Sequence, residues 1–471
     1  MAATSVPQLV AYAQGVGYAS WRGLATAGPT LFAWGLATGS PFMSCGVTSI
    51  TALMAKADLD GENYVAEHGE QAYVNLVAAY SLWVGLCSAI LGIVGFGKLA
   101  GMVPSNVRKG FKVRFLLHRN NNETLTLVSI THQFNSKMKI QWGCSVGVVA
   151  SAMPNGLFTQ GSTELKGLVM QSGAASFVAY MKSNFPAATG AVSVTNLLYA
   201  ISHPGDWGMI AAPLFILCTA FVMKGKNFLP KSFPPGTEVI IATALATIMS
   251  MKFDYPGNVV GEIPQLDPDA GINLGPIKVP ISVMNLKDLM AAPVVDCFGG
   301  SYVTLIISAS LFAAVNFLSI MGIASSFETE NGIKWSAPRE LIAQGIACGV
   351  AGFTGSAPVS GSMSRSLVSR MAGTTSQASC LITALIWIYM MPYMSVMSPT
   401  PQAALAAVIM SAVVKSVVFP KDLMAMKGTD IIVGWGTGVG TAVTSPTIGF
   451  GIGLLLVAVT SVMKPKKEKT A

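Results

Sequence analysis

The sequence contains the stretch Gly355-Ser356-Ala357-Pro358-Val359-Ser360-Gly361-Ser362, which interrupts a long apolar region with small and polar residues. A similar stretch, Ser40-Pro41-Phe42-Met43-Ser44-Cys45-Gly46, occurs in the first half of the chain. Each leads into an apolar segment, 43–57 or 361–372, that is shorter than the roughly 20 residues a helix needs to cross a bilayer. Short segments interrupted by Gly and Pro at matching places in two halves indicate a ligand site inside a membrane protein.

The composition excludes an ordinary soluble protein. Apolar residues make up 52% of the 471 residues and charged residues only 11%, whereas a soluble domain carries roughly 25% charged residues. Several runs without any charged residue, such as 72–97, 302–327 and 431–463, are long enough to span a membrane. The 48 Gly residues favour close helix packing within lipid. We therefore predict an all-α polytopic membrane protein.

The positive charge does not indicate a nucleic-acid-binding protein. The formal net charge is +8, but Lys and Arg are grouped in short clusters between apolar segments. An even number of predicted segments separates each pair of clusters, so all of them lie on one side, which the positive-inside rule assigns to the cytoplasm. The acidic loops near 58–70 and 254–269 then lie outside. The basic clusters are Arg108, Lys109 and Lys112; Lys224, Lys226 and Lys231; Lys415, Lys421 and Lys427; and Lys464, Lys466, Lys467 and Lys469.

The apolar segments number about fourteen, and the two short ones are the third and the tenth. These places are equivalent if the chain consists of two repeats of seven segments. Because seven is odd, the second repeat is then inverted relative to the first. The predicted segments are 6–24, 26–40, 43–57, 71–100, 142–160, 207–223, 236–252, 302–326, 339–355, 361–372, 375–395, 401–418, 429–445 and 446–463.

An interrupted helix offers an anion-binding end in the middle of the membrane. The first backbone N–H groups of a helix have no partner within it, and the helix dipole adds about half a positive charge there. Two such ends that face each other attract an anion. Arg365 follows the second interruption, and a guanidinium so deep in the membrane is a functional candidate. The alternative is an Arg that reaches the lipid interface.

The sequence offers little for catalysis or metal binding. The seven Cys residues are scattered and form no CxxC pair, so we interpret them as small buried apolar residues. Only four His occur, and acidic residues are almost absent from the apolar segments. No nucleotide-binding, serine-hydrolase or zinc-protease motif is present. We therefore predict no enzymatic activity, no cofactor and no metal site.

Several motifs resemble those of the SulP family of sulfate permeases and anion exchangers, called solute carrier family 26 in animals. The stretch Arg339-Glu340-Leu341-Ile342-Ala343-Gln344-Gly345 resembles the family's QELIA-x-G motif, and 358–368 resembles its SxSxSRS segment. The loop 259–264 is similar to the family's VVGEIP loop. The first span resembles the family signature at Val6-Pro7-Gln8 and 11–13, and Ser44-Cys45-Gly46 stands where the family has Ser-Val-Gly.

This resemblance covers most of the chain and implies an architecture. The family fold would have fourteen spans in a seven-plus-seven inverted repeat, with a core domain (spans one to four and eight to eleven) that moves against a gate domain. The anion would lie between the third and tenth spans, bound by hydroxyl and N–H groups, with Arg365 supplying positive potential. The binding residues that the resemblance implies are Gln8, Tyr12, Ser44, Cys45, Gly46, Ser362, Ser364 and Arg365.

The chain departs from the family pattern at three places. Proton- or sodium-coupled members carry a carboxylate in the eighth span near the position of Leu318, and none stands here, so exchange or uniport is favoured. The family's C-terminal STAS domain is missing, so we expect a transmembrane domain over 1–463 and a basic cytoplasmic tail over 464–471. The first span lacks its leading half, which indicates a misplaced start codon or a longer N-terminus.

The segment 113–141 also interrupts the family pattern, and joining Lys112 to Trp142 restores it. The segment contains Asn120-Asn121-Asn122-Glu123 and two of the four His residues. Val codons begin with GT and Gln can be encoded by CAG, the usual splice borders, so one hypothesis is a translated intron. The alternative is a genuine insertion in a cytoplasmic loop.

The main functional hypothesis is transport of small inorganic or carboxylate anions, such as sulfate, bicarbonate, chloride or oxalate, with an elevator-like movement of the core. One alternative is a non-transporting or truncated membrane protein, such as a sensor or motor. Another is a nucleobase permease, which would need carboxylates in the eighth and tenth spans, and we find none there. A homodimer is compatible with the resemblance. No signal or transit peptide is visible, so the plasma membrane is the default, with the plastid or vacuolar membrane as alternatives.

Overall fold

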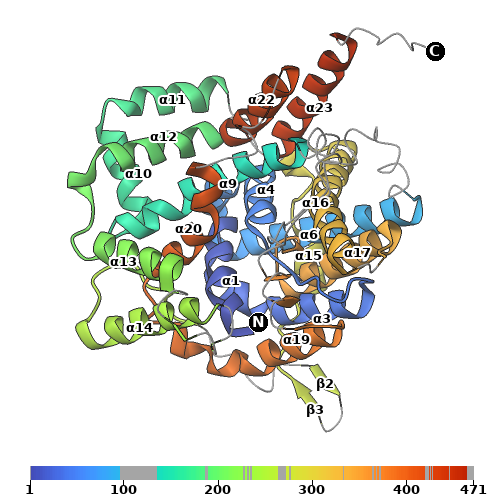
Figure 1. Cartoon of the computed structure of the whole chain (residues 1–471), viewed down its shortest axis with the longest axis horizontal. Coiled ribbons are helices and arrows are strands. Elements are labelled where there is room, and N and C mark those ends of the chain that lie inside the picture. Colours follow the sequence, from blue (N-terminus) through green and yellow to red (C-terminus); the bar gives the residue numbers. More distant parts are fainter. Residues whose placement is uncertain are drawn as a thin grey trace, which may run out of the picture.

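The computed structural model is almost entirely helical (Figure 1). The residues that it describes are 2–95, 135–185, 189–225, 229–230, 233, 236–263, 272–274, 277–331, 334–362, 365–366, 369–370, 373–418, 424, 426, 428–444 and 446–463. The helices are α1 (Ala2–Val16), α2 (Arg22–Ala25), α3 (Ala27–Ala37), α4 (Ser49–Asp58), α5 (Gly61–His68), α6 (Glu70–Ile93), α9 (Asn135–Leu157), α10 (Gly161–Gln171), α11 (Ala174–Asn184), α12 (Thr189–Ser202), α13 (Ala211–Lys224), α14 (Thr237–Phe253), α15 (Leu286–Ala291), α16 (Tyr302–Asn331), α17 (Ala337–Thr354), α19 (Ala378–Met390), α20 (Gln402–Val418), α22 (Thr429–Val443) and α23 (Pro446–Met463).

The longer helices form two groups that face each other. The first, which we call the core group, contains α1, α3, α4, α6, α16, α17 and α19, and its closest packing joins α6 to α17 and α3 to α19. The second, the gate group, contains α9, α12, α13, α14, α20, α22 and α23, with α9 packed against α20 and α22. In Figure 1, α3, α6, α16 and α17 of the core group lie on the right, α1 and α4 in the centre and α19 at the bottom, whereas most helices of the gate group lie on the left and along the top. The two groups meet where α1 and α4 contact α9 and α20.

Small residues allow α6 and α17 to pack closely. A Cβ atom added to Gly345 would lie 2.8 Å from the carbonyl oxygen of Gly85, and one added to Gly85 would lie 2.9 Å from that of Gly345. Such close approach of two backbones is the usual means of helix association in lipid, where no hydrophobic force joins helices. The helix pair therefore supplies a rigid scaffold behind the interrupted segments.

Two small antiparallel strand pairs accompany the helices. Strand β1 (Cys45–Gly46) pairs with β4 (Ser360–Gly361), and β2 (Ile272–Leu274) pairs with β3 (Ile277–Val279) as a hairpin at the bottom of Figure 1. The first pair joins the two segments that the sequence analysis identified as interruptions. The core of the fold is thus held together at the place where its helices break.

The predicted segments coincide closely with helices in most of the chain, but the prediction was incomplete in places. The first span was expected to reach residue 24, whereas α1 ends at Val16 and Gly17 takes a φ of +109°. Helices α10, α11 and α12 were not predicted, because Glu, Lys and Asn interrupt the apolar pattern between 161 and 202. A 3-10 turn, Met391–Met397, continues α19 at its end.

Three helices in the described part of the chain are long and apolar enough to cross a membrane on their own: Glu70–Ile93, Tyr302–Ala324 and Ala378–Met397. Four shorter apolar helices accompany them: Gly190–Ser202, Ala211–Lys224, Gln402–Ser411 and Ile431–Val443. The count of fourteen spans and the seven-plus-seven repeat therefore stay predictions.

Two predictions fall largely outside the described residues. Of the segment 113–141, the structure describes only Asn135–Gln141, which form the first turns of α9. The tail 464–471 lies entirely outside. The intron hypothesis and the extent of the transmembrane domain therefore stay predictions as well.

Candidate functional site

The two interrupted segments meet in a short antiparallel ladder. Cys45 lies opposite Gly361 and Gly46 opposite Ser360. The Ser362 N–H donates to the carbonyl oxygen of Ser44 at 2.8 Å, which extends the pairing by one residue on each side. From this ladder the two chains leave in opposite directions, so the helical segments that follow both start beside it. The predicted meeting of Ser44 and Ser362 is thus observed.

One face of the ladder carries two buried hydroxyl groups that lack hydrogen-bond partners. Side chains alternate between the faces of a strand, so Ser44 and Gly46 share a face with Ser360 and Ser362. The Oγ atoms of Ser44 and Ser360 are buried and have no partner among the described residues. An unpaired buried hydroxyl costs about 1–3 kcal/mol. We call this face, with Ser44, Gly46, Ser360 and Ser362, the polar face.

Arg365 lies against the polar face and has no acidic partner in the described part of the chain. A Cβ atom on Gly46 would meet its Nη1 at 2.8 Å, so the guanidinium lies directly over that glycine. Arg365 is only 2% exposed, and its Nη2 donates to the carbonyl oxygen of Val47 at 3.0 Å. Its Nε and Nη1 donate to none of the described residues. A buried cation is expensive unless an anion accompanies it, so this arrangement is suited to an anionic ligand.

The helical segments add positive potential beside Arg365. Helix α4 starts at Ser49, and Thr48 caps it: the Thr51 N–H donates to Thr48 Oγ1 at 3.3 Å, and Thr51 Oγ1 accepts from the Thr48 N–H at 2.9 Å. The capping box takes two of the N–H groups near this end, and the N–H groups of Ser49 and Ile50 have no partner within the helix. The start of α4 therefore keeps N–H groups of the kind that suit an anionic ligand.

The hydroxyl of Ser366 locks the second helical segment to the first strand. It donates to the carbonyl oxygen of Ser362 at 2.6 Å and accepts from the Ser44 N–H at 3.0 Å. Arg365 and Ser366 are helical, whereas the predicted binding residue Ser364 lies outside the described residues. Ser366 thus fixes the strand and helix of opposite halves in one register.

The other face of the ladder is held by side chains of the core group. The carbonyl oxygen of Met43 accepts from Trp34 Nε1 at 3.0 Å, and that of Val359 accepts from Asn316 Nδ2 at 2.8 Å. Cys45 points to this side by strand alternation, away from the hydroxyl groups of the polar face. Its side chain is completely buried, and its predicted role as a ligand stays a prediction.

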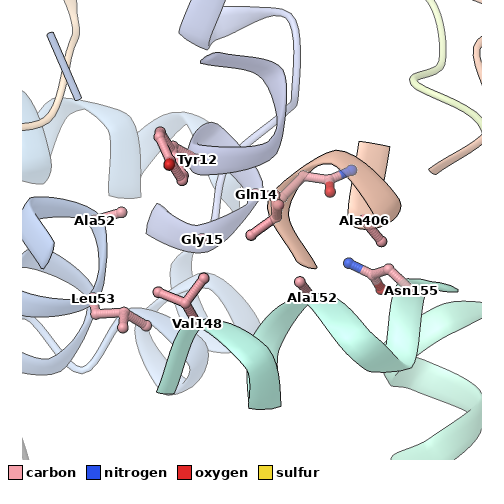
Figure 2. A pocket seen from close by; sticks show the side chains of 10 residues that line it. Tyr12, Gln14, Gly15, Ala52, Leu53, Val148, Ala152, Asn155 and Ala406 are labelled. Atoms are coloured by element: carbon pink, nitrogen blue, oxygen red, sulfur yellow. The ribbon is translucent and has the colours of Figure 1, made fainter. Parts of the chain in front are cut away.

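The predicted residues of α1 face the junction of the two helix groups. Tyr12 is partly buried and lies within electrostatic range of Arg365. Gln8 is partly buried, and its Oε1 has no partner among the described residues. Tyr12, Gln14 and Gly15 also line a narrow cavity whose opposite wall is formed by α9 and α20 (Figure 2). Helix α1 therefore connects the polar face to the cavity.

The cavity is narrow, and its wall is mostly apolar. Its volume is about 30 Å³, which is enough for one or two water molecules. Figure 2 shows the amides of Gln14 and Asn155 on opposite sides of it, from α1 and α9. A hydrated anion that reaches the polar face by this route therefore needs the core and gate groups to separate.

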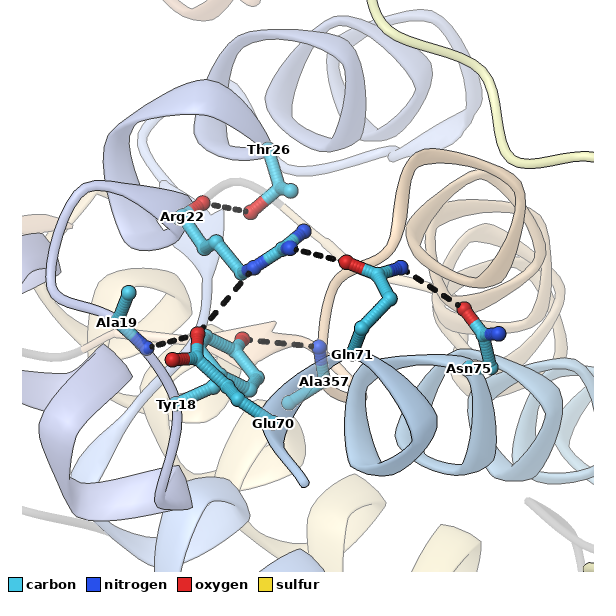
Figure 3. A network of polar contacts seen from close by, with 8 residues as sticks. All are labelled: Tyr18, Ala19, Arg22, Thr26, Glu70, Gln71, Asn75 and Ala357. Atoms are coloured by element: carbon cyan, nitrogen blue, oxygen red, sulfur yellow. Dashed lines mark hydrogen bonds and ion pairs between the residues drawn. The ribbon is translucent and has the colours of Figure 1, made fainter. Parts of the chain in front are cut away.

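A second cluster ties α1 to both interrupted halves (Figure 3). The Ala357 N–H, just before β4, donates to the Tyr18 hydroxyl at 3.3 Å. Arg22 donates from Nη2 to Gln71 Oε1 at 2.8 Å, and its Nε lies 3.6 Å from Glu70 Oε1. These contacts fix the loop after α1 and the start of α2 to the start of α6 and to the approach to β4.

Glu340 positions the chain that leads into β1. Its carboxylate is fully buried and accepts from Thr38 Oγ1 and from the Gly39 N–H, both at 2.8 Å. The neighbouring Arg339 donates from Nε to the Ala37 carbonyl oxygen at 3.1 Å and from Nη2 to the Thr38 carbonyl oxygen at 3.0 Å. The start of α17 thus holds the end of α3 and the following loop.

We expect Glu340→Gln to destabilise the protein, because the amide has only one acceptor oxygen and its NH₂ group would face a donor. A lost charged hydrogen bond of this kind costs roughly 1.5–3 kcal/mol. The midpoint of thermal unfolding of the purified protein should fall. Glu67→Gln is the matched control, because the Glu67 side chain is 72% exposed. Equal midpoints for both variants would contradict the positioning role.

A comparison with protein families shows to which family the chain belongs. The model of the sulfate permease family matches residues 1–114 and 187–435. The chain belongs to the sulfate permease family. The predicted family and the prediction of a membrane protein are confirmed. The family model does not match residues 115–186 of this chain. These residues include most of the segment 113–141 and the helices α10 and α11.

Curated relatives are similar to this chain over most of the length of this chain. It is 24% identical over 412 residues to Sulfate transporter 4.1, chloroplastic, of Arabidopsis thaliana, which covers 87% of this chain and 49% of that protein. It is 26% identical over 417 residues to Probable sulfate transporter MT1781 of Mycobacterium tuberculosis, with 88% and 60% covered. The chain therefore spans about half the length of the curated relatives it matches.

Two solved structures show the same fold as this chain. The murine Slc26a9 anion transporter in its inward-facing state superposes with a TM-score of 0.69 and 16% identity, over 98% of this chain and 67% of that one. The transmembrane domain of the cyanobacterial bicarbonate transporter BicA gives 0.63 and 15%, over 98% and 94%. The fold of a transporter's membrane domain is thus shared.

Four features of the candidate site were not predicted from the sequence. The predicted residues did not include Ser360, whose hydroxyl is unpaired, or Ser366, which joins the two halves. The Val47 carbonyl and the Thr48 cap were also not predicted. Ser360 and Ser366 stand within the SxSxSRS resemblance, so the serine spacing of that segment was the available signal. Nothing in the sequence marks a backbone carbonyl such as that of Val47.

Proposed function

We propose that this permease carries small anions across a membrane by moving the core group against the gate group. The observation that supports this most directly is the buried guanidinium of Arg365, which has no acidic partner among the described residues and lies over Gly46, on the ladder face that also carries two unpaired hydroxyl groups. An anion there would satisfy the Nε and Nη1 donors and the Ser44 and Ser360 hydroxyls together. Sulfate, bicarbonate, chloride and oxalate are the candidate substrates.

The position of the site supports an alternating exposure of this anion. The ladder belongs wholly to the core group, whereas α9 and α20 of the gate group close the cavity near Tyr12. A movement of the core group as one body would carry the ladder past the gate helices, because hydrogen bonds tie the strands to α3, α16 and the helical segment at Ser366. The site would then open to each side in turn.

The apolar residue at position 318 supports exchange or uniport. Leu318, the position where coupled relatives were expected to carry an acid, is a partly buried apolar residue of α16. Its buried neighbour Asn316 uses its amide nitrogen to hold Val359. Neither side chain can take up a proton, so coupling at this position would need another group. One relative is named as chloroplastic, which keeps the plastid membrane as an alternative to the plasma membrane.

The proposal is tested by flux through liposomes that contain the purified chain. Labelled sulfate, bicarbonate, chloride and oxalate should be offered in turn, with and without an opposing anion and with and without a proton or sodium gradient. We expect uptake of at least one anion that rises with a trans anion and ignores the cation gradients. Uptake equal to that of protein-free liposomes for all four anions would contradict transport and favour the sensor or motor alternative.

We also expect Ser44→Ala and Ser360→Ala each to weaken anion binding modestly. Each substitution removes one hydrogen bond to the anion, worth about 0.5–1.5 kcal/mol, which corresponds to a roughly 2- to 12-fold higher half-saturating concentration. The measurement is the concentration dependence of uptake. Ser202→Ala is the control, because this serine is exposed and lies on α12 of the gate group. Unchanged half-saturation in both ladder variants would remove the hydroxyls from the site.

A further inference from the structure

The outer surface of the core group carries an apolar groove that the anion site does not use. It has a volume of about 450 Å³ and lies between α3, α17 and α19. Its floor on α3 consists of Pro29, Phe32, Ala33 and Leu36, which recur at the spacing of one helix face. Leu36 is 63% exposed and so is open to the surroundings. In a membrane protein, a groove on such a surface faces lipid.

A positive charge marks one end of this groove. On α17 the groove is lined by Ile346 and Val350. Arg339 lies seven residues before Ile346 and eleven before Val350, spacings that place all three on one face of the helix. Arg339 is exposed and donates from Nε to the carbonyl oxygen of Ala37, which also lines the groove. The guanidinium therefore stands at the mouth of the groove.

The dimensions of the groove suit one acyl chain. From Arg339 to Val350 the helix rises by about 16 Å, which is close to the roughly 15 Å thickness of half a hydrocarbon core. The sequence places the basic clusters and Arg339 on the same predicted side of the membrane, so the charged end is at the interface where phosphate groups are found. The Ala37 and Thr38 carbonyl oxygens accept hydrogen bonds from Nε and Nη2 of Arg339, so Nη1 is not needed to hold them.

We propose that this groove binds an anionic phospholipid, with its phosphate at Arg339 and one acyl chain along Ile346 and Val350. A lipid bound in this groove also affects the anion site, because Arg339 holds the loop that leads into β1. A phosphate on the free edge of the guanidinium restrains that loop. Anionic lipid therefore stabilises the approach to the ladder from outside the helix bundle.

The test is native mass spectrometry of the full chain, purified in detergent and incubated with equal amounts of phosphatidylglycerol and phosphatidylcholine of the same acyl composition. We expect one phosphatidylglycerol to remain bound where phosphatidylcholine dissociates. Ile346→Trp, which fills the middle of the groove from its 46% exposed position, should reduce the retained phosphatidylglycerol about tenfold. The control is Ile248→Trp on α14, a 58% exposed position far from the groove.

A second variant separates the headgroup from the chain. Arg339→Gln should retain both lipids equally, because it removes the charge and leaves the groove open. Equal retention of both lipids by the unsubstituted chain, or full retention of phosphatidylglycerol by Ile346→Trp, would overturn the proposal. Because lipid retention is measured without any flux, its failure and a failure of anion transport can be told apart.

Discussion

Arg365→Gln should abolish most anion transport while leaving the protein folded. The guanidinium is buried over Gly46 without an acidic partner among the described residues, so the protein itself gains little from keeping the charge there. The bound anion, however, would lose the buried counter-charge of Arg365, which costs about 2–5 kcal/mol. This corresponds to a roughly 30-fold or larger rise in its dissociation constant. Initial uptake rates in liposomes, measured over a range of anion concentrations, provide the test.

Two further variants make this result specific. Arg365→Lys keeps the charge and loses the planar fork, so we expect binding between that of the parent and that of the Gln variant. Lys252→Gln removes one positive charge from the exposed end of α14 and should leave uptake unchanged. Transport by Arg365→Gln at the parent rate for every anion that the parent carries would show that the anion binds elsewhere.

Gly46→Ala should also cause a large loss of anion affinity, because backbone strain and a clash with Arg365 act at the same position. The backbone of Gly46 has a φ of +156°, which side-chain-bearing residues rarely adopt and which costs about 1–3 kcal/mol. The added Cβ would also lie 2.8 Å from Arg365 Nη1 and 3.0 Å from Nη2, so the guanidinium must move. We expect at least a tenfold loss of anion affinity, about 1.4 kcal/mol, measured from the concentration dependence of uptake.

Gly349→Ala is the matched control, because a Cβ at this position on α17 meets no atom within 4 Å. Its uptake should equal that of the parent. The unfolding midpoint of Gly46→Ala indicates how much of its effect is strain in the fold. If Gly46→Ala transports as well as Gly349→Ala, then the arginine does not act from its position over the ladder.

Much of this architecture could be predicted from the sequence, because helices in lipid are long and apolar and their ends are marked by charge. Arg365 was predicted from its charge beside the second interruption, whereas Ser44 and Ser362 were predicted as site residues from the family resemblance. Helices α10 to α12 were not, since Glu164, Lys166 and Lys182 break the apolar pattern there. The ladder was also beyond reach, because two-residue strands have no periodicity to recognise.

The direction of individual side chains could not be predicted either. The family resemblance implied that Cys45 binds the anion, whereas alternation along the strand places its side chain on the face opposite Ser44 and Gly46. Ser360, two residues before Ser362, shares the face of the arginine instead. Which residues of a serine-rich segment face a ligand depends on the register between two distant strands, and a single sequence does not contain that register.

The pairing of β1 with β4 has a consequence for the biosynthesis of the protein. The hydrogen bond from the Ser44 N–H to Ser366 Oγ joins residues 322 positions apart. At translation rates of about 5–20 residues per second, the first strand waits roughly 16–64 s for its partner to emerge. During that interval the backbone polar groups of β1 lack the strand with which they pair in the folded protein. We therefore expect the first half of the chain to depend on the translocon or a membrane chaperone until β4 has emerged.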